Sequence, residues 1–331
     1  MTSKRLVARA AVTLLLGLGA LTGAHAQTVL KVSHFLPPGS NFQKSFLEPW
    51  CERIAKDSAD KLKCQIYPAL QLGGTPAQLA DQVKNGVSDI VWTSPSYSTG
   101  RFPRTEALEL PFTMPPDGVG GSRAMRGFYG KHAREDYEDF KDLTIWSADF
   151  KGVKLRSPSR VAALFLTALG GTPVNMPVAQ VTEGVSKGVI DGAMAPWEVL
   201  PATKIDEVVK FHMEGQANQP GFTQTPMALL MNQRKFDSLP ADLKAVVEKN
   251  SGLVAAEWLG KVWDDGNNDA RKSLAARGNK VLTIKNEDLA AIKKQTASVE
   301  ADWIKQATAR GLDGKKLAAE AHAIGAKYMP K

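Results

Sequence analysis

Short apolar stretches rich in β-branched residues alternate with helical patterns through most of the chain. Strands are predicted at residues 29–34, 63–67, 87–92, 153–156 and 226–231. Helical patterns separate these stretches, and glycine and proline mark the turns between them. Strands that alternate with helices in this way are typical of an α/β protein.

The first helical pattern follows the opening strand. One face of this helix collects the apolar side chains of Phe42, Phe46, Leu47, Trp50 and Ile54. Asn41 stands where it can cap the helix, and Pro49 predicts either a bend in it or a later true start of the helix.

A helix over residues 76–85, a stop at Gly86 and a following strand form a unit that recurs at residues 186–193. Two such units predict two lobes of similar topology, and ligands of open α/β sheets bind beyond the carboxyl ends of the strands. Trp92 and Trp197, near the ends of the two strands, would then face each other across a cleft. Chance similarity of a short pattern is the alternative.

Helical patterns dominate the chain from residue 243 onward, and residues 287–329 predict amphipathic helices near the end. The buried side of one long helix is predicted from five apolar positions, Leu253, Val254, Trp258, Val262 and Trp263.

Residues 1–26 have the pattern of a signal peptide. Basic residues open the segment, an apolar stretch follows over residues 10–21, and Ala24 and Ala26 flank His25 as in a cleavage site. We therefore expect export to the periplasm, with a retained signal anchor as the alternative. No later segment offers the roughly twenty apolar residues that a membrane span requires.

The length of 331 residues exceeds what one compact core usually organises, which again favours two lobes. The net charge of +8 falls to +5 without residues 1–26, which contain three basic and no acidic side chains. This mild excess comes without a basic run, so we expect no nucleic acid partner. A positive field would help to attract anionic solutes.

Cys51 and Cys64 are the two cysteines of the chain. In an oxidising compartment, a pair thirteen positions apart is expected to form a structural disulfide that joins the first helix to the following strand. Two buried free thiols are the alternative.

Motifs of catalysis are scarce. The five histidines show no metal-ligand spacing, and the chain has no nucleophile-elbow motif and no phosphate-binding glycine loop. We therefore expect no metal, no cofactor and no enzymatic activity, although catalytic groups that come together only in three dimensions remain an alternative.

Arg156 is the first candidate for ligand contact, because it ends a short predicted strand that is followed by a helix. A guanidinium there could point into a cleft and bind a carboxylate through two parallel hydrogen bonds. A solvated surface arginine is the alternative.

Aromatic side chains could wall an apolar pocket around such an arginine. The candidates are Trp92, Tyr97, Trp197 and Phe222, for each of which core packing is the alternative. His34, at the end of the first strand, is either a pocket donor or a histidine satisfied inside the core.

A series of motifs runs in order over nearly the whole chain after residue 26. It comprises QLGG at 71–74, QVxxGxxD at 82–89, ELPF at 109–112, GVKLR at 152–156, LGxxPxxMP at 169–177 and GVIDG at 188–192. Together these motifs resemble the solute-binding proteins of tripartite ATP-independent periplasmic (TRAP) transporters.

The resemblance implies a two-lobed periplasmic-binding-protein-like α/β fold with hinge strands and a long bracing helix. Such a protein closes over an organic acid and docks on a membrane transporter of a small and a large subunit. In this family an arginine at the position of Arg156 binds the solute carboxylate. The resemblance also places residues near Met176 to Val178 and the segment from Ala193 to Glu198, which includes Ala195, at the pocket. Residues 92–97, from Trp92 to Tyr97, form the facing wall.

Two departures from the family qualify the expected ligand. Members that bind sialic acid carry asparagine where Ala195 stands and phenylalanine where Val178 stands, so sialic acid is not expected. The Pro-Trp-Glu sequence at 196–198 resembles a branch that takes smaller carboxylates, some of them aromatic. The stretch between residues 143–147 and Asp149 is also shorter than in the family, which often places a second basic contact there.

The sequence thus predicts a monomeric periplasmic carrier that captures a small organic carboxylate and delivers it to a TRAP transporter. Lobe I is expected to comprise residues 27–147 and 226–266, and lobe II residues 148–225 and 267–331, with the ligand between them. A ligand-sensing partner of a signalling receptor, built on the same fold, is the alternative function.

Overall fold

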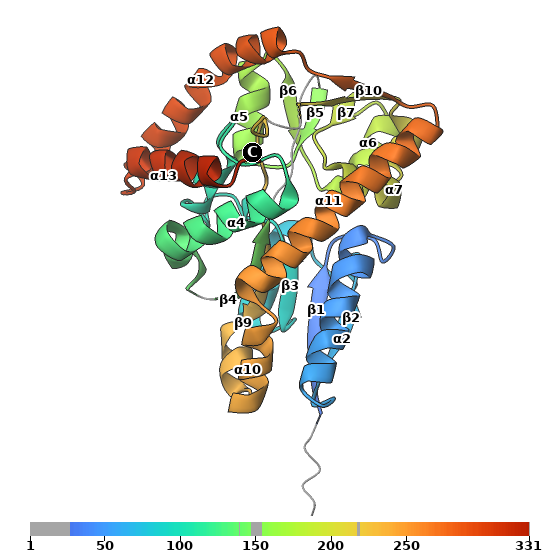
Figure 1. Ribbon diagram of the computed structural model, residues 1–331, viewed down its shortest axis with the longest axis vertical. Coiled ribbons are helices and arrows are strands. Elements are labelled where there is room, and N and C mark those ends of the chain that lie inside the picture. The colour runs from blue at the N-terminus through green and yellow to red at the C-terminus, as the bar shows by residue number, and fades with distance from the viewer. Residues whose placement is uncertain (1–26, 139, 147–153, 217–218, 331) are drawn as a thin grey trace, which may run out of the picture.

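Two separate β-sheets organise the computed structural model, which describes residues 27–138, 140–146, 154–216 and 219–330 (Figure 1). The larger sheet has the order β2-β1-β3-β9-β4, and we call the part built on it lobe I. A three-stranded sheet, β6-β5-β7, organises the other part, which we call lobe II. This arrangement confirms the predicted two-lobed α/β fold.

Lobe I has a mixed sheet. Strands β1 (Thr28–His34), β2 (Leu62–Tyr67) and β3 (Ile90–Thr93) are parallel, whereas β9 (Met227–Asn232) is antiparallel to both β3 and β4 (Phe140–Trp146). Strand β3 starts three residues later than the predicted strand at 87–92. Val87 remains in the turn after Gly86 and is 45% exposed.

Lobe II has a parallel sheet of short strands. Its strands are β5 (Lys154–Ser157), β6 (Thr172–Asn175) and β7 (Gly192–Ala193). A separate parallel pair joins β8 (Phe211–Glu214) to β10 (Lys280–Thr283). Residue 153 of the predicted strand at 153–156 lies outside the described residues.

The first helix confirms the predicted apolar face but not the predicted cap. It consists of a π-helical turn, η1 (Phe42–Leu47), which continues into α2 (Glu48–Asp57). The side chain of Asn41 makes no capping hydrogen bond, because its Nδ2 instead donates to the carbonyl of Val262, 2.9 Å away. Asn41 therefore ties this segment to a distant helix.

Gly86 ends the second helix as predicted. A 3-10 turn, η2 (Pro76–Gln78), leads into α3 (Leu79–Asn85), and Gly86 follows with a φ of 79°, in the left-handed region that favours glycine. The recurrent unit in lobe II consists of α6 (Val181–Ser186), a left-handed Gly188 and β7.

The remaining connections are short helices. In lobe II, α5 (Arg160–Ala168) begins after Ser159, whose side chain accepts a hydrogen bond from the Ala162 amide. The others are α7 (Leu200–Thr203), α8 (Ile205–Val208), α9 (Gln233–Ser238), α10 (Ala241–Lys249) and the turns η3 (Pro95–Tyr97), η4 (Thr105–Glu109), η5 (Tyr129–Ala133), η6 (Arg134–Tyr137), η7 (Val178–Gln180) and η8 (Trp197–Val199).

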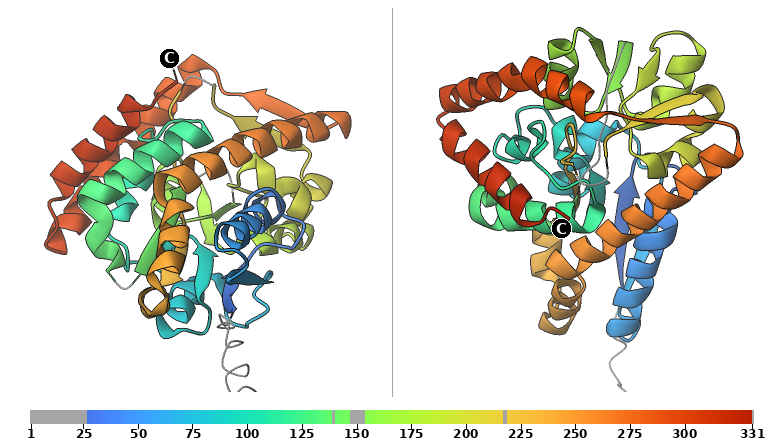
Figure 2. Two further views of the ribbon diagram at one scale, coloured as in Figure 1. Left: turned by 60° about the horizontal axis from the view of Figure 1, so that its bottom comes forward. Right: turned by 45° about the horizontal axis from the view of Figure 1, so that its top comes forward.

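Helix α11 (Gly252–Ala276) is the predicted bracing helix. It runs diagonally past lobe I and reaches the helices of lobe II (Figures 1 and 2). It crosses α4 (Gly118–Phe128) so closely that a Cβ on Gly260 would lie 2.4 Å from the carbonyl oxygen of Gly118. The predicted buried side is wrong at Leu253 and Val254, which are 46% and 56% exposed. They lie in the first turn of α11 and face away from the buried side of the helix, which begins at Ala255.

The last two helices return the chain toward lobe I. Helix α12 (Asn286–Ala309) contacts α5 of lobe II, and α13 (Gly314–Lys327) packs against α4 (Figure 2). The predicted residue boundaries of the two lobes stay a prediction. The predicted signal peptide at 1–26 lies outside the described residues, and so does most of the short stretch before Asp149.

No helix in the described part of the chain is both long enough and apolar enough to cross a membrane.

Cys51 and Cys64 form a disulfide in the structure, with their Cα atoms 5.7 Å apart. The bond joins α2 to β2, at the edge of the larger sheet.

Replacing both cysteines by serine is expected to lower the free energy of unfolding by about 3 kcal/mol, because the crosslink restricts a loop of this size in the unfolded chain. Urea denaturation of both proteins, without reductant, measures the difference. Equal unfolding free energies would show that the bond does not form in the folded protein.

Candidate functional site

A cavity lies where the carboxyl ends of strands from both lobes meet. The segments after β1 and β3 reach it from lobe I, and those after β5 and β7 reach it from lobe II. It encloses about 490 Å³ of space between atoms, part of which is open to solvent. Its lining residues are Phe35, Leu36, Trp92, Tyr97, Arg156, Pro158, Val178, Met194, Ala195, Pro196, Glu198, Val199, Thr225, Met227 and Trp263.

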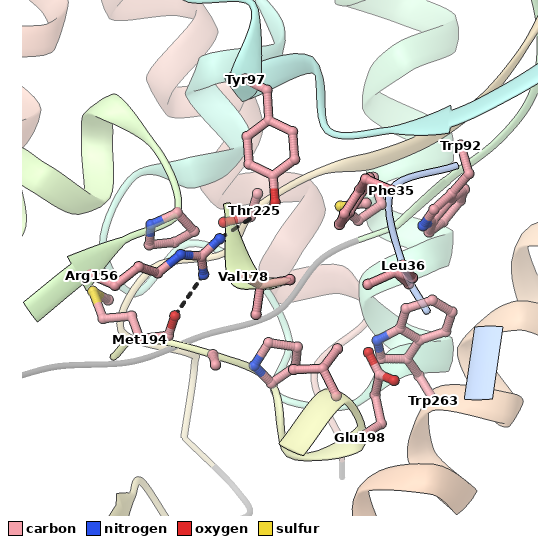
Figure 3. A pocket seen from close by; sticks show the side chains of 15 residues that line it. Phe35, Leu36, Trp92, Tyr97, Arg156, Val178, Met194, Glu198, Thr225 and Trp263 are labelled. Atoms are coloured by element: carbon pink, nitrogen blue, oxygen red, sulfur yellow. Dashed lines mark hydrogen bonds between the residues drawn. The ribbon is translucent and has the colours of Figure 1, made fainter. Parts of the chain in front are cut away.

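Arg156 enters this cavity from β5 and is only 2% exposed (Figure 3). Its Nε donates to the carbonyl of Met176 and its Nη1 to the carbonyl of Met194, each over 2.8 Å. Its Nη2 reaches the hydroxyl of Tyr97 at 3.4 Å, which brings the two lobes into contact. Both carbonyls belong to segments after neighbouring strands, so the sheet of lobe II holds the guanidinium in place.

The positive charge of Arg156 has no protein counter-charge within the residues described. Three of the five N–H donors of a guanidinium are used by the carbonyls and Tyr97, and no aspartate or glutamate pairs with it. Burial lowers the pKa of Arg156 from its ordinary value. By contrast Arg160, the first residue of α5, pairs with Glu106 at 2.5 Å. Arg156 is therefore a buried cation that receives hydrogen-bond acceptors, but no opposite charge, from the described residues.

Aromatic rings line the cavity on the side of lobe I. Trp92 is buried and stacks on Phe42, with ring centroids 4.3 Å apart and planes at 14°. Trp263, from α11, lies 5.7 Å from Trp92, and Phe35 packs edge-on against Tyr97. These contacts fix the rings before any ligand binds.

Glu198 is the second ionisable group of the cavity with an unusual environment. It is 4% exposed, and neither carboxyl oxygen has a hydrogen-bond partner among the residues that the structure describes. Burial raises its pKa from 4.5 to about 8, so the carboxyl is neutral at pH 7. Figure 3 shows Glu198 beside Trp263, on the side of the cavity away from Arg156.

Five of the predicted site residues line this cavity together. They are Trp92, Tyr97, Arg156, Val178 and Ala195. Met176 takes part through its carbonyl, which accepts a hydrogen bond from Arg156, rather than through its side chain.

Three predicted site residues lie elsewhere. His34 is buried and hydrogen-bonded to Gln43, and burial lowers its pKa to about 4, so it is a neutral core histidine. Phe222 packs against Phe165 in the core of lobe II.

Trp197 lines a separate hollow with His212, and its ring lies under the guanidinium of Arg271. The prediction that Trp92 and Trp197 face each other is therefore wrong. The turn η8 begins at Trp197 and directs it away, while Glu198 faces the cavity.

Trp263 is the cavity residue of greatest chemical interest that the sequence prediction did not place in the site. It was assigned to the buried side of the long helix, and periodicity cannot tell a core contact from a cavity contact. Glu198 ends the segment 193–198 that the resemblance placed at the pocket, and it does line the cavity, but no role was assigned to its carboxyl group.

No cluster of three or more potential metal ligands occurs in the described part of the chain.

Comparison with known proteins assigns this architecture to a family. The profile described as bacterial extracellular solute-binding protein, family 7, matches residues 32–306. A TRAP solute binding protein from Rhodoferax ferrireducens, solved with copurified benzoate, is 35% identical and has a TM-score of 0.87. The match covers 91% of this chain and 98% of that one.

Two further solved structures extend the comparison. A TRAP solute binding protein from a marine metagenome, described as specific for aromatic acid ligands, was solved with 3-hydroxybenzoate. It is 39% identical with a TM-score of 0.87, and the match covers 92% of this chain and 99% of that one. A TRAP protein from Bordetella bronchiseptica, solved with (R)- and (S)-mandelate, is 26% identical over 91% of this chain and 99% of its own, with a TM-score of 0.80. The predicted resemblance to this group is confirmed.

The burial of Glu198 predicts a pH-dependent effect of the variant Glu198→Gln. The folded carboxyl keeps its proton up to about pH 8, whereas the unfolded carboxyl loses it near pH 4.5, so this group lowers the stability of the protein progressively between those values. Glutamine does not titrate. The gain in unfolding free energy of Glu198→Gln should therefore grow by on the order of 3 kcal/mol from pH 5 to pH 8.

Urea denaturation of both proteins at the two pH values measures this gain. Glu109, whose pKa burial also raises to about 8, and His34 are present in both proteins, so their contributions cancel. A gain that is the same at pH 5 and pH 8 would show that the carboxyl of Glu198 is hydrated in the folded protein.

Proposed function

This chain belongs to family 7 of the bacterial extracellular solute-binding proteins, and we propose that it captures a small aromatic carboxylate and delivers it to the membrane subunits of a TRAP transporter. It is a stoichiometric carrier, in which binding of the solute favours closure of the two lobes. The closed form is the one that the transporter recognises.

The unpaired guanidinium of Arg156 carries this proposal. It is buried, it is held by two carbonyls, and two of its N–H donors lack an acceptor among the described residues. A carboxylate in the cavity would accept charge-assisted hydrogen bonds from these donors and neutralise the buried charge. A neutral solute would leave the charge uncompensated in a closed cavity, so the site favours anions.

The walls of the cavity support an aromatic ligand. Trp92, Trp263, Phe35 and Tyr97 offer flat apolar surfaces, and a ring gains both burial and ring contacts from them. The two relatives above 30% identity were solved with benzoate and 3-hydroxybenzoate, which are acids of this class.

The proposed location is the periplasm, after removal of residues 1–26 as a signal peptide. The family description as extracellular solute-binding proteins supports export. We propose that the solute is released unchanged, since the similar structures are binding proteins and the cavity presents a neutral acid and an arginine rather than an activated nucleophile.

Benzoate binding to the Arg156→Ala variant tests the proposal. We expect the wild-type protein to bind benzoate or a substituted benzoate in isothermal titration calorimetry, and to be stabilised against heat in proportion to ligand occupancy. Arg156→Ala should weaken binding at least about 100-fold, because two charge-assisted hydrogen bonds are lost. Arg156→Gln removes the charge but keeps an amide donor at about the position of Nε, which bonds the Met176 carbonyl, and it should also bind poorly.

Arg160→Ala is the matched control. Arg160 is the next arginine in the sequence, but Glu106 neutralises it and it does not line the cavity. Binding by this variant should match the wild type within about threefold. Unchanged benzoate affinity in a folded Arg156→Gln protein would contradict the assigned role of Arg156, and the absence of binding of any carboxylate to the wild type would contradict the proposed function.

A further inference from the structure

The carboxyl group of Glu198 is a buried polar group without hydrogen-bond partners in the described part of the chain. Both oxygens are buried in the wall of the cavity, and within the described residues neither has a donor or acceptor nearby. Buried polar atoms without a partner are uncommon and destabilising, so their presence at a ligand cavity points to a partner supplied by the ligand. The arrangement complements that of Arg156, whose free donors also face the cavity.

The backbone of Glu198 is fixed in position. Its amide donates to the side chain of Asn267 on α11, over 3.1 Å. A Cβ on Gly266 would lie 3.2 Å from the Cβ of Glu198, so the glycine allows this segment to approach the helix closely. The long helix therefore presents the carboxyl to the cavity, and a site held in this way can discriminate between ligands.

Arg156 and Glu198 define two polar ends of one cavity. Figure 3 shows them on different sides, with Val178 between them and the indoles of Trp92 and Trp263 on the side of Glu198. A ligand whose carboxylate binds Arg156 would therefore direct its remote end toward Glu198. Thr225 is the other lining residue whose side-chain oxygen lacks a partner in the described part of the chain.

We propose that Glu198 is a specificity-determining residue that hydrogen-bonds a hydroxyl group at the end of the ligand remote from its carboxylate. The ligand class is thereby narrowed to hydroxylated aromatic monocarboxylic acids. This inference rests on the proposed function, because it takes the carboxylate of the ligand to be bound by Arg156.

A hydroxyl group fits the site better than a second charge. A neutral carboxyl can donate one hydrogen bond and accept another, which matches a hydroxyl that also does both. Burial favours the neutral form of Glu198 at pH 7, since its pKa is raised to about 8. A second carboxylate on the ligand would find no cation at this end, because Arg156 is the one cationic side chain among the lining residues. A ligand ammonium group would require the ionised form that burial disfavours.

The experiment compares ligand pairs that differ only in one hydroxyl group. The probes are benzoate and phenylacetate, each with its 2-, 3- and 4-hydroxy derivatives, and their dissociation constants are measured by calorimetry at pH 7. For the wild type, at least one hydroxylated acid should bind about 10- to 100-fold more tightly than its parent, as expected for satisfying a buried polar group. In Glu198→Leu this preference should fall to threefold or less, while the parent acid binds at least as well as to the wild type.

Two further variants serve as controls, one for misfolding of Glu198→Leu and one for the other unpartnered hydroxyl in the cavity. Glu198→Gln retains a donor and an acceptor, so a folded Glu198→Gln protein should keep a preference for the hydroxylated acid even where Glu198→Leu fails to fold. Thr225→Val removes the other unpartnered lining hydroxyl with little change in shape and should leave the preference intact.

The outcomes separate this inference from the proposed function. Three results would show that Glu198 does not bind a ligand hydroxyl. Acids could bind in an Arg156-dependent manner without any preference for hydroxylated ones. Alternatively, the preference could survive in Glu198→Leu, or it could be lost only in Thr225→Val. Tighter binding of benzene dicarboxylates than of hydroxylated acids would overturn the ligand class. If no acid binds to the wild type, the proposed function itself fails.

Discussion

A buried guanidinium, to which the described residues offer no counter-ion, is the constraint on which the rest of this site depends. Desolvating such a charge costs several kcal/mol unless hydrogen bonds and an opposite charge offset the loss. The carbonyls of Met176 and Met194 supply part of the hydrogen bonding, and Tyr97 supplies a contact from the other lobe. In the proposed function, an anion in the cavity would supply the opposite charge and so couple ligand capture to closure of the two lobes.

The same arrangement divides the work of recognition between the two lobes. Lobe II, through Arg156 and Glu198, supplies groups that can bind the polar parts of a ligand, whereas lobe I supplies most of the aromatic surface. Since the apolar surface is non-directional, it selects for size and flatness. The polar groups at the two ends have fixed directions and select for the positions of substituents. A flat acid of the proposed kind would therefore need contacts from both lobes, one for its ring and the other for its polar groups.

The fold and the central arginine could be predicted from the sequence, but parts of the cavity could not. Periodicity placed the strands because the burial of β3 and β9 leaves continuous apolar runs. Arg156 was a candidate from its place at the end of a predicted strand, but a lone arginine is more often solvated, and only the family motif made the prediction strong. Trp197 and Glu198 are adjacent, and the local backbone of η8 decides which of them faces the cavity. Asn41 is a residue type that often caps helices. Its side-chain amide instead donates to the carbonyl of Val262, which lies more than two hundred residues away in the sequence. Such choices depend on tertiary contacts that local patterns do not encode.

Gly266 gives the bracing helix a role beyond support. A Cβ at this position would lie 2.3 Å from Nδ2 of Asn41, which follows β1, and 3.2 Å from the Cβ of Glu198, which follows β7. The absence of a side chain at this point of the helix thus leaves room for one segment from each lobe. A larger residue there would act as a wedge that lowers the fraction of closed molecules, and apparent affinity scales with that fraction. The same wedge would also displace Glu198, so one position that touches no solute governs both the overall affinity and the placement of a carboxyl group in the cavity wall.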